Sequence, residues 1–111
     1  MVERREEALN AYNTAITLNP AQAQSWFNMG TVLIEEERYE DALRALDAAL
    51  DLCPDEPEVW NNRGAALFKL GRYEEARVCF DQAHLLDPDF YEAAVNRERV
   101  LDGTDYKLIF L

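Results

Sequence analysis

The stretch Trp60–Ala76 reads WNNRGAALFKLGRYEEA, and the earlier stretch Trp26–Ala42 reads WFNMGTVLIEEERYEDA. Trp, Asn, Gly, Leu, Arg-Tyr-Glu and Ala all return after an interval of 34 residues, without a gap. The same interval relates Ala49 to Ala83, Pro54 to Pro88 and, further along, Asn62 to Asn96. Self-similarity at a fixed period of this length indicates a stack of structural repeats, each of which buries its apolar face against its neighbours.

Within each repeat, helical periodicity alternates with breaks that contain proline, at 19–22, 53–57 and 87–90. The residue before a proline resists the helical conformation, so each break ends a helix. We therefore expect six helices, at about 2–19, 23–36, 39–52, 57–70, 73–86 and 91–102. Gly71 suits the turn after a helix, whereas Glu37 occupies the equivalent position of the first copy.

Two glycines inside the expected helices, Gly30 and Gly64, predict a close crossing of paired helices. Glycine in a helix interior costs roughly 1 kcal/mol relative to alanine, and close packing is the benefit that offsets this cost. We expect the small residues Ala42 and Ala76 to face these glycines.

The pattern W-x2-M-G-x2-L…A-x3-L…P from Trp26 to Pro54 resembles the tetratricopeptide repeat. The second copy reads W-x2-R-G-x2-L…A-x3-F…P, with Arg63 in place of the usual apolar residue. This resemblance implies an all-α fold, a TPR-type α-solenoid of antiparallel helix pairs in a right-handed superhelical stack. It implies a single domain over 1–102, followed by an apolar C-terminal tail at 103–111. The domain divides into the second helix of a partial repeat at 1–20, full repeats at 23–56 and 57–90, and a capping helix at 91–102.

The composition is acidic, with a net charge of −11, and this argues against nucleic acid and anionic membrane surfaces as partners. A neutral or basic protein partner is electrostatically easier. No run of eighteen apolar residues is present, so no transmembrane helix is expected, and MVERREEALN at the start lacks the apolar core of a secretory signal. Cys53 and Cys79 lack metal-type spacing, and we interpret them as reduced thiols, which favours a cytoplasmic location.

Residues with catalytic or metal-binding chemistry are sparse. His84 is the single histidine, and it stands in a helical pattern without a nucleophile or carboxylate at a motif spacing. The acidic cluster Asp51, Asp55, Glu56 and Glu58 lacks the spacing of a calcium loop. The scattered glycines form no phosphate-binding loop. We expect no enzyme activity, no cofactor and no metal.

The resemblance implies that the first helix of each repeat lines a concave surface, on which an extended segment of a partner protein binds. We therefore expect a non-catalytic protein- or peptide-binding scaffold. The expected groove residues are Gln24, Phe27, Asn28, Thr31, Ile34, Glu58, Asn61, Asn62, Ala65, Phe68, Lys69, Glu92, Val95, Asn96 and Arg99.

Two peptide-binding modes of the family are compared with these residues. The carboxylate clamp for chaperone tails needs lysines where Phe27 and Glu92 stand and an arginine where Asn96 stands; only Asn62 fits. Acidic chaperone tails are therefore poor ligand candidates. An asparagine ladder, as in the repeats of O-linked N-acetylglucosamine transferase, fits Asn28, Asn62 and Asn96, because an amide pairs with a peptide backbone in either sense. The alternative is that these asparagines only satisfy nearby backbone groups.

A second function is self-association. The first helix begins within a repeat, so Val2, Leu9, Tyr12 and Ile16 are expected to leave an apolar stripe open to a second copy, as in a homodimer. The tail sequence YKLIFL at 106–111 would either cover its own final helix as a cap or exchange into a neighbouring molecule.

Overall fold

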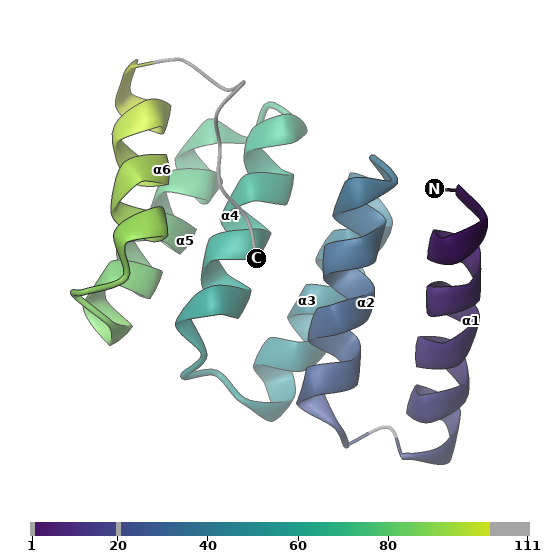
Figure 1. Ribbon diagram of the computed structural model, residues 1–111. Helices are drawn as coiled ribbons and strands as arrows, with labels where there is room; N and C mark the ends of the chain where they lie inside the picture. The colour runs from purple at the N-terminus through teal and green to yellow at the C-terminus, as the bar shows by residue number, and fades with distance from the viewer. Residues whose placement is uncertain (1, 20, 103–111) are drawn as a thin grey trace.

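The computed structural model describes residues 2–19 and 21–102, which form an all-α stack (Figure 1). The helices of this part of the chain are α1 (Val2–Leu18), α2 (Ala23–Glu35), α3 (Tyr39–Leu52), α4 (Pro57–Lys69), α5 (Tyr73–Leu86) and α6 (Tyr91–Asp102). The expected helices agree with the observed bounds to within one residue, and the prediction of an all-α fold is confirmed. The expected apolar tail, 103–111, lies outside the described residues.

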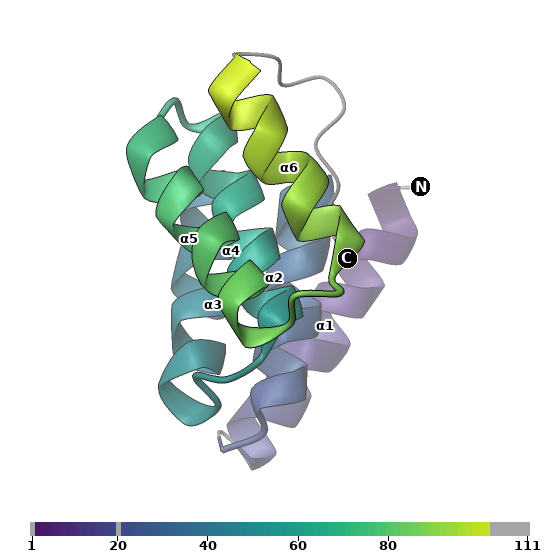
Figure 2. The same ribbon diagram turned by 90° about the vertical axis from the view of Figure 1, so that its left-hand side faces the viewer.

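The helices are arranged in two layers. In Figure 1, α2, α4 and α6 lie in the near layer with α3 and α5 behind them, and Figure 2 shows α3 and α5 together on one side. The near layer, α2, α4 and α6, packs on α3 and α5, which are its neighbours in the chain. Within the near layer, α4 contacts both α2 and α6. The carboxyl ends of α2, α4 and α6 lie at the same end of the molecule (Figure 1).

The turns between paired helices have the same hydrogen bonds in both repeats. The amides of Arg38 and Arg72 donate to the carbonyls of Leu33 and Leu67, at 2.8 and 2.9 Å. This pattern places one residue of each turn in the left-handed region, namely Glu37 at a φ of 60° and Gly71 at a φ of 80°. The first turn therefore does form without glycine, in a conformation that glycine would adopt more cheaply.

The breaks between repeats are held by proline and tryptophan. Pro57 opens α4 at its first turn, where a missing N–H costs no helical hydrogen bond. The indole Nε1 of Trp60 donates to the carbonyl of Pro54 at 2.8 Å, which ties α4 to the loop before it. Trp60 of the second copy is thus joined to Pro54 of the first.

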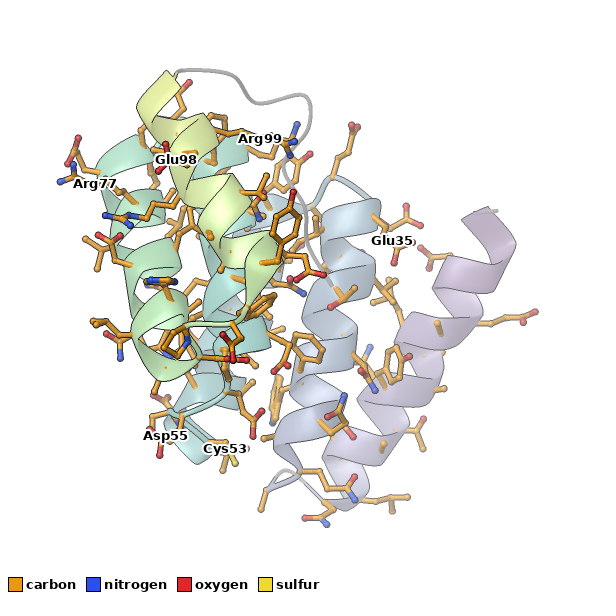
Figure 3. The ribbon with its side chains drawn as sticks, turned by 60° about the vertical axis from the view of Figure 1, so that its left-hand side comes forward. Glu35, Cys53, Asp55, Arg77, Glu98 and Arg99 are labelled. Carbon is orange, nitrogen blue, oxygen red and sulfur yellow. The ribbon has the colours of Figure 1, made fainter. Side chains whose placement is uncertain are left out.

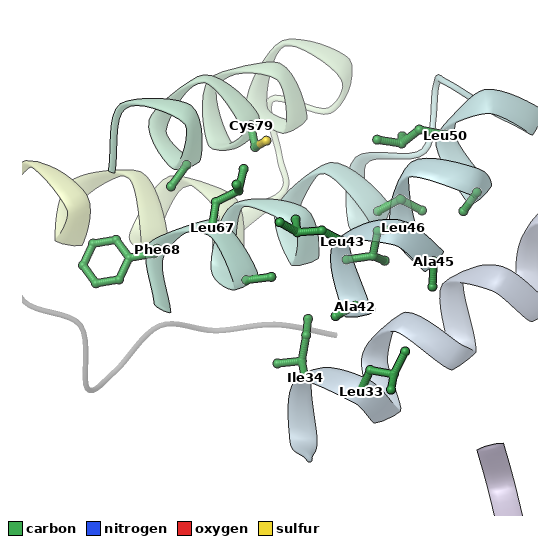
Figure 4. Close-up of a cluster of buried hydrophobic side chains, with 14 of the residues drawn as sticks. Leu33, Ile34, Ala42, Leu43, Ala45, Leu46, Leu50, Leu67, Phe68 and Cys79 are labelled. Carbon is green, nitrogen blue, oxygen red and sulfur yellow. The ribbon is translucent and has the colours of Figure 1, made fainter. Parts of the chain in front are cut away.

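The hydrophobic core runs between the two layers. Leu33, Leu46, Leu67 and Phe80 are each 2% exposed or less, and Figure 4 shows the first three in one cluster that spans α2, α3 and α4. Buried alanines, such as Ala42 and Ala76 at 0% exposure, let the helices approach one another. One core cluster therefore joins the two full repeats, and a smaller one, formed by Ala83, Phe90 and Ala93, lies between α5 and α6.

Gly30 and Gly64 lie at close helix crossings, as expected, but their nearest neighbours differ from the expectation. A Cβ at Gly30 would lie 2.7 Å from the side chain of Leu46, and one at Gly64 would lie 2.6 Å from the ring of Phe80. The nearest atoms are therefore those of large side chains one helical turn beyond Ala42 and Ala76. Each glycine makes room for a leucine or phenylalanine to reach the core.

Helix α1 contacts α2 and no other described helix. Leu9, which the sequence places in an exposed stripe, is only 5% exposed and belongs to the core cluster. That expectation is wrong for Leu9, because α2 covers this side chain. Tyr12 and Ile16 are partly buried.

Candidate functional site

The expected groove residues lie on the near layer, but they differ widely in exposure. Buried are Ile34, Asn61, Asn62, Ala65, Phe68 and Asn96. Partly buried are Phe27, Asn28, Thr31, Glu58, Glu92, Val95 and Arg99. Gln24 and Lys69 are exposed.

Amide side chains connect the helices of this layer. The Nδ2 of Asn62 donates to Thr31 Oγ1 at 3.0 Å, which links α4 to α2. The Nδ2 of Asn96 donates to Asn61 Oδ1 at 3.0 Å, which links α6 to α4. Buried amide hydrogen bonds of this kind hold neighbouring helices in register. Both of these partners are side chains of a neighbouring helix.

The first asparagine of the period behaves differently from the other two. Asn28 accepts a hydrogen bond from Gln24 Nε2 at 2.9 Å, within its own helix. Asn62 and Asn96 are 0% exposed, whereas Asn28 is partly exposed. The 34-residue period therefore yields two amides that link helices and a third, Asn28, that is more open to solvent.

A pocket of about 540 Å³ lies where α2, α3 and α4 meet. It is lined by Ala23, Gln24, Phe27, Ala49, Cys53, Glu56, Glu58 and Val59. Its apolar wall comes mainly from Phe27 and Val59, and its carboxylates come from Glu56 and Glu58. A pocket of this size with an apolar wall and acidic rim suits a side chain that is apolar, or long and positively charged.

Charges of both signs border the layer. Glu58 and Glu92 stand in the first turns of α4 and α6, where a negative charge is favoured by the helix dipole. At the other end, Arg99 extends from α6 on the side on which α2 lies (Figure 3). Its Nη1 is buried without a hydrogen-bond partner among the described residues. The site thus offers carboxylates at the amino ends of its helices and one guanidinium donor near a carboxyl end.

Two ion pairs that sequence reasoning missed repeat at the same period. Arg63 Nε of α4 lies 2.7 Å from Asp47 Oδ1 of α3, and Arg97 Nε of α6 lies 2.6 Å from Asp81 Oδ1 of α5. Both acids and both arginines are 34 residues apart, so the signal was in the sequence. The departure at Arg63 from the apolar pattern is explained by this pairing between repeats.

Arg63 also reaches into the core. Its Nη1 donates to Cys79 Sγ at 3.0 Å. Burial raises the pKa of the Cys79 thiol above its ordinary value, although the Arg63 guanidinium opposes the shift. Burial alone would lower the pKa of Arg63, but the bonds to Asp47 and Cys79 outweigh it and the pKa is raised. Cys53, by contrast, is a free and exposed thiol in the loop after α3 (Figure 3).

A second pocket, of about 430 Å³, lies on α2 and α3. Its lining combines apolar side chains with three charged ones: Trp26, Met29, Leu33, Arg38, Asp41, Arg44, Ala45 and Ala48. Both arginines donate to Asp41, and the hydrogen bond from Arg38 is the leading cause of the lowered pKa of that carboxyl. The charges of this pocket are therefore paired with one another.

The remaining residues that the sequence offers for catalysis or metal binding do not form a common site. Asp51, Asp55 and Glu56 are exposed around the loop between α3 and α4, and His84 is half-buried on α5. Residues 2–19 and 21–102 contain no group of three or more His, Cys, Asp or Glu side chains placed to hold a metal ion. Over the same residues, none of the helices combines the length and the apolar character that crossing a bilayer requires.

Comparison with solved structures gives close matches in fold. The first TPR of Spaghetti (RPAP3), bound to the HSP90 peptide SRMEEVD, matches with a TM-score of 0.88 at 21% identity, over 91% of this chain and 80% of that one. The Arabidopsis OM64 TPR domain matches with a TM-score of 0.87 at 28% identity, over 90% and 83%. The second TPR domain of human RPAP3, in complex with the HSP70 peptide SGPTIEEVD, matches with a TM-score of 0.85 at 24% identity, over 89% and 82%.

A comparison with curated protein sequences gives no match. Family models do match: a TPR repeat model covers residues 4–34 and 30–71, and a tetratricopeptide repeat model covers 57–90. The matched segments include both copies of the tryptophan–glycine pattern and the helix before them. The chain belongs to the tetratricopeptide repeat family.

Proposed function

We propose that the protein is a non-catalytic scaffold whose near layer, α2, α4 and α6, holds an extended segment of a partner protein. The fold supports this proposal, because two structures of the same fold contain bound HSP90 or HSP70 peptides. The observation that carries it is the pocket of about 540 Å³ where α2, α3 and α4 meet, together with the partly exposed amide of Asn28, which accepts a hydrogen bond from the pocket residue Gln24. Amides pair with a peptide backbone, and the pocket receives one side chain.

The ligand that suits this face is neutral or basic. Phe27 and Glu92 occupy positions at which the family's clamp for acidic tails has lysines. The carboxylates of Glu58 and Glu92, together with a net charge of −11, favour a ligand that carries lysine or arginine. The guanidinium of Arg99 provides a donor for a backbone carbonyl of the ligand. We therefore propose a partner segment that is extended, partly apolar and not acidic.

The two free cysteines suit a reducing compartment, and we propose a cytoplasmic location on that ground.

A library of displayed random peptides tests this function. Peptides that the protein enriches are synthesised, and their affinity is measured by calorimetry at low and at physiological salt. The groove variant carries Glu58→Lys and Glu92→Lys. The matched control carries Glu40→Lys and Glu74→Lys, because these acids occupy the first turns of α3 and α5 and the change in net charge is the same.

We expect the groove variant to bind the enriched peptides about tenfold more weakly at low salt, and the control variant to bind within about twofold of the parent. Melting curves of both variants separate a loss of binding from a loss of folding. An equal loss in the two variants would show that net charge, not this face, controls binding. Enrichment of acidic peptides would contradict the proposed ligand.

Self-association is the second candidate. The observation that favours it is the pocket of about 430 Å³ on α2 and α3, whose apolar wall includes Trp26 and Met29. None of the described side chains of α1, at 6–18, belongs to its lining. Light scattering across a range of protein concentrations tests this function: a constant monomer mass contradicts it, and a rise toward the dimer mass supports it.

A further inference from the structure

The pocket of about 540 Å³ where α2, α3 and α4 meet combines apolar walls with an acidic rim. Val59 is 5% exposed and Ala49 is 0% exposed, so the core fixes both of them, and Phe27 adds a partly buried aromatic ring. Glu58 is partly buried and Glu56 is exposed, and both stand at the start of α4. A side chain that fills this pocket therefore meets apolar surface along its length and carboxylates at the edge.

The carboxylates of this pocket are not neutralised by the described part of the chain. Among those residues, no ion pair involves Glu56 or Glu58. Helix α2 has no lysine or arginine, and residues 45–62 contain five acidic residues and no basic one. The arginines that flank this stretch, Arg44 and Arg63, each pair with an aspartate of α3. The pocket of about 430 Å³ differs, because its charges are paired with one another.

We propose that the pocket of about 540 Å³ determines the specificity of the groove and takes an arginine side chain of the partner segment. The inference rests on the proposed function, since it assigns one side chain of the extended ligand to one place. The three methylenes of the arginine pack on Phe27 and Val59, and its guanidinium reaches the rim, where it pairs with Glu56 and Glu58.

Arginine fits this lining better than lysine does. Its guanidinium is planar and weakly hydrated, so it stacks on an aromatic ring such as that of Phe27, whereas an ammonium group holds its water more strongly. It also has five N–H donors, so one group serves both carboxylates and an amide oxygen. Gln24 lines the pocket and supplies that oxygen, because its Nε2 already donates to Asn28 and its Oε1 remains an acceptor.

The same glutamine connects the pocket to the rest of the groove. Asn28 lies one turn after Gln24 on α2, is partly exposed and accepts from Gln24 through its Oδ1. Its Nδ2 can therefore donate to a backbone carbonyl of the ligand. An arginine in the pocket and a backbone hydrogen bond at Asn28 both involve α2, so the partner segment runs along this helix from its arginine.

The probe is Nα-acetyl-arginine methylamide, titrated into isotope-labelled protein and followed by NMR chemical shifts. The matched control is the citrulline derivative, which has the same shape without the charge. We expect the arginine derivative to shift the amides of Phe27, Cys53 and Val59 in a saturable manner, with a Kd on the order of 1 mM. The citrulline derivative should bind about tenfold more weakly, and the lysine derivative about threefold more weakly.

The pocket variant carries Glu56→Gln and Glu58→Gln, which keep the size of both side chains. The matched control carries Glu40→Gln and Glu74→Gln, with the same change in net charge in the first turns of α3 and α5. We expect the pocket variant to bind the arginine derivative about tenfold more weakly than the parent, and the control variant to bind it within about twofold. Melting curves establish that both variants are folded.

Three results of these titrations overturn the inference. One is equal affinity of the parent for the arginine and citrulline derivatives. Another is the absence of saturable shifts at the pocket amides up to about 50 mM of the arginine derivative. The third is a lysine derivative that binds as tightly as the arginine derivative, which removes the reason for choosing a guanidinium.

The library peptides described under the proposed function separate the two failures. Enriched peptides that contain arginine are synthesised again with citrulline in its place, and we expect about tenfold weaker binding to the parent. If the citrulline peptides bind equally well, or the enriched peptides lack arginine, the arginine pocket is wrong and the peptide-binding function stands. If no library peptide binds the parent, the peptide-binding function falls and the inference falls with it.

Discussion

At the scale of single residues, the two turns between paired helices form a natural comparison. Glu37 and Gly71 have the same role and the same hydrogen bonds, and both have positive φ. A left-handed conformation costs a residue with a Cβ roughly 1–2 kcal/mol, and glycine adopts it without this cost. The first repeat therefore has a local strain that the second lacks.

We expect Glu37→Gly to stabilise the protein by about 0.5–1 kcal/mol, because relief of the strain exceeds the added entropy of the unfolded chain. The free energy of unfolding is measured by urea denaturation. The reverse change, Gly71→Glu, is the matched control and should destabilise by a similar amount. A Cβ at Gly71 meets no atom within 4 Å, so backbone conformation alone is tested there. Destabilisation by Glu37→Gly would show that the Glu37 side chain contributes more than its strain.

At the scale of helices, close packing in the second repeat limits the size of the residue that can stand at Gly64. A Cβ added there would lie 2.6 Å from the Phe80 ring, which is 0% exposed and cannot move away. We expect Gly64→Ala to destabilise by about 1–3 kcal/mol despite the higher helix propensity of alanine. The double variant Gly64→Ala with Phe80→Leu should recover part of the loss in thermal melts. A single variant that melts at or above the parent temperature would contradict this packing.

The ion pair between Asp47 and Arg63 joins one repeat to the next. The Arg63 side chain is 25% exposed and that of Asp47 is 52% exposed, so the pair is partly screened by solvent. We expect a double-mutant cycle with Asp47→Ala and Arg63→Ala to give a coupling energy of about 0.5–1 kcal/mol. Raising the salt concentration should reduce it. The pair Asp81 and Arg97 serves as a replicate at the next junction, and a coupling of zero at both would show that the pairs do not hold the repeats together.

The sequence predicts the helices of this fold well, because several of their boundaries have a local cause. Proline at 54, 57 and 88 ends or begins helices through its own ring, so the bounds follow without knowledge of packing. Which side chain faces a given helix position is decided by the packing of one helix on another, and the local sequence does not show it. Ala42 was expected against Gly30, but the nearest side chain is Leu46, one turn further along α3.

The candidate site shows the same limit. Periodicity identifies Asn62 and Asn96 as equivalent, and both lie on the near layer. It does not reveal that one donates to a threonine and the other to an asparagine, because those partners, Thr31 and Asn61, hold different repeat positions. Nor does it reveal how deeply the face is buried, since exposure depends on everything that packs over it.

At the scale of the whole molecule, a stack in which repeats contact only their neighbours has a stability that varies along its length. Helices α3 and α4 are packed on both sides and contain much of the core. Helix α1 contacts α2 alone, and Leu9 is the one buried side chain among residues 6–19. The acid and arginine that pair at the later junctions are replaced by Asn13 and Met29 at this junction. Local opening should therefore begin at α1.

Native-state hydrogen exchange measures this gradient. We expect the amides of α1 to exchange through local opening at a free energy several kcal/mol below that of α4, whose amides should exchange only when the whole chain unfolds. Leu9→Ala should speed exchange in α1 and leave α4 nearly unchanged. Leu46→Ala, which removes a side chain that is 0% exposed at the centre of the stack, should cost about 2–5 kcal/mol and speed exchange in both helices. If Leu9→Ala lowered protection in α4 as much as in α1, the chain would unfold as one cooperative unit, because the single contact of α1 with α2 would then be strong enough to couple the first helix to the centre.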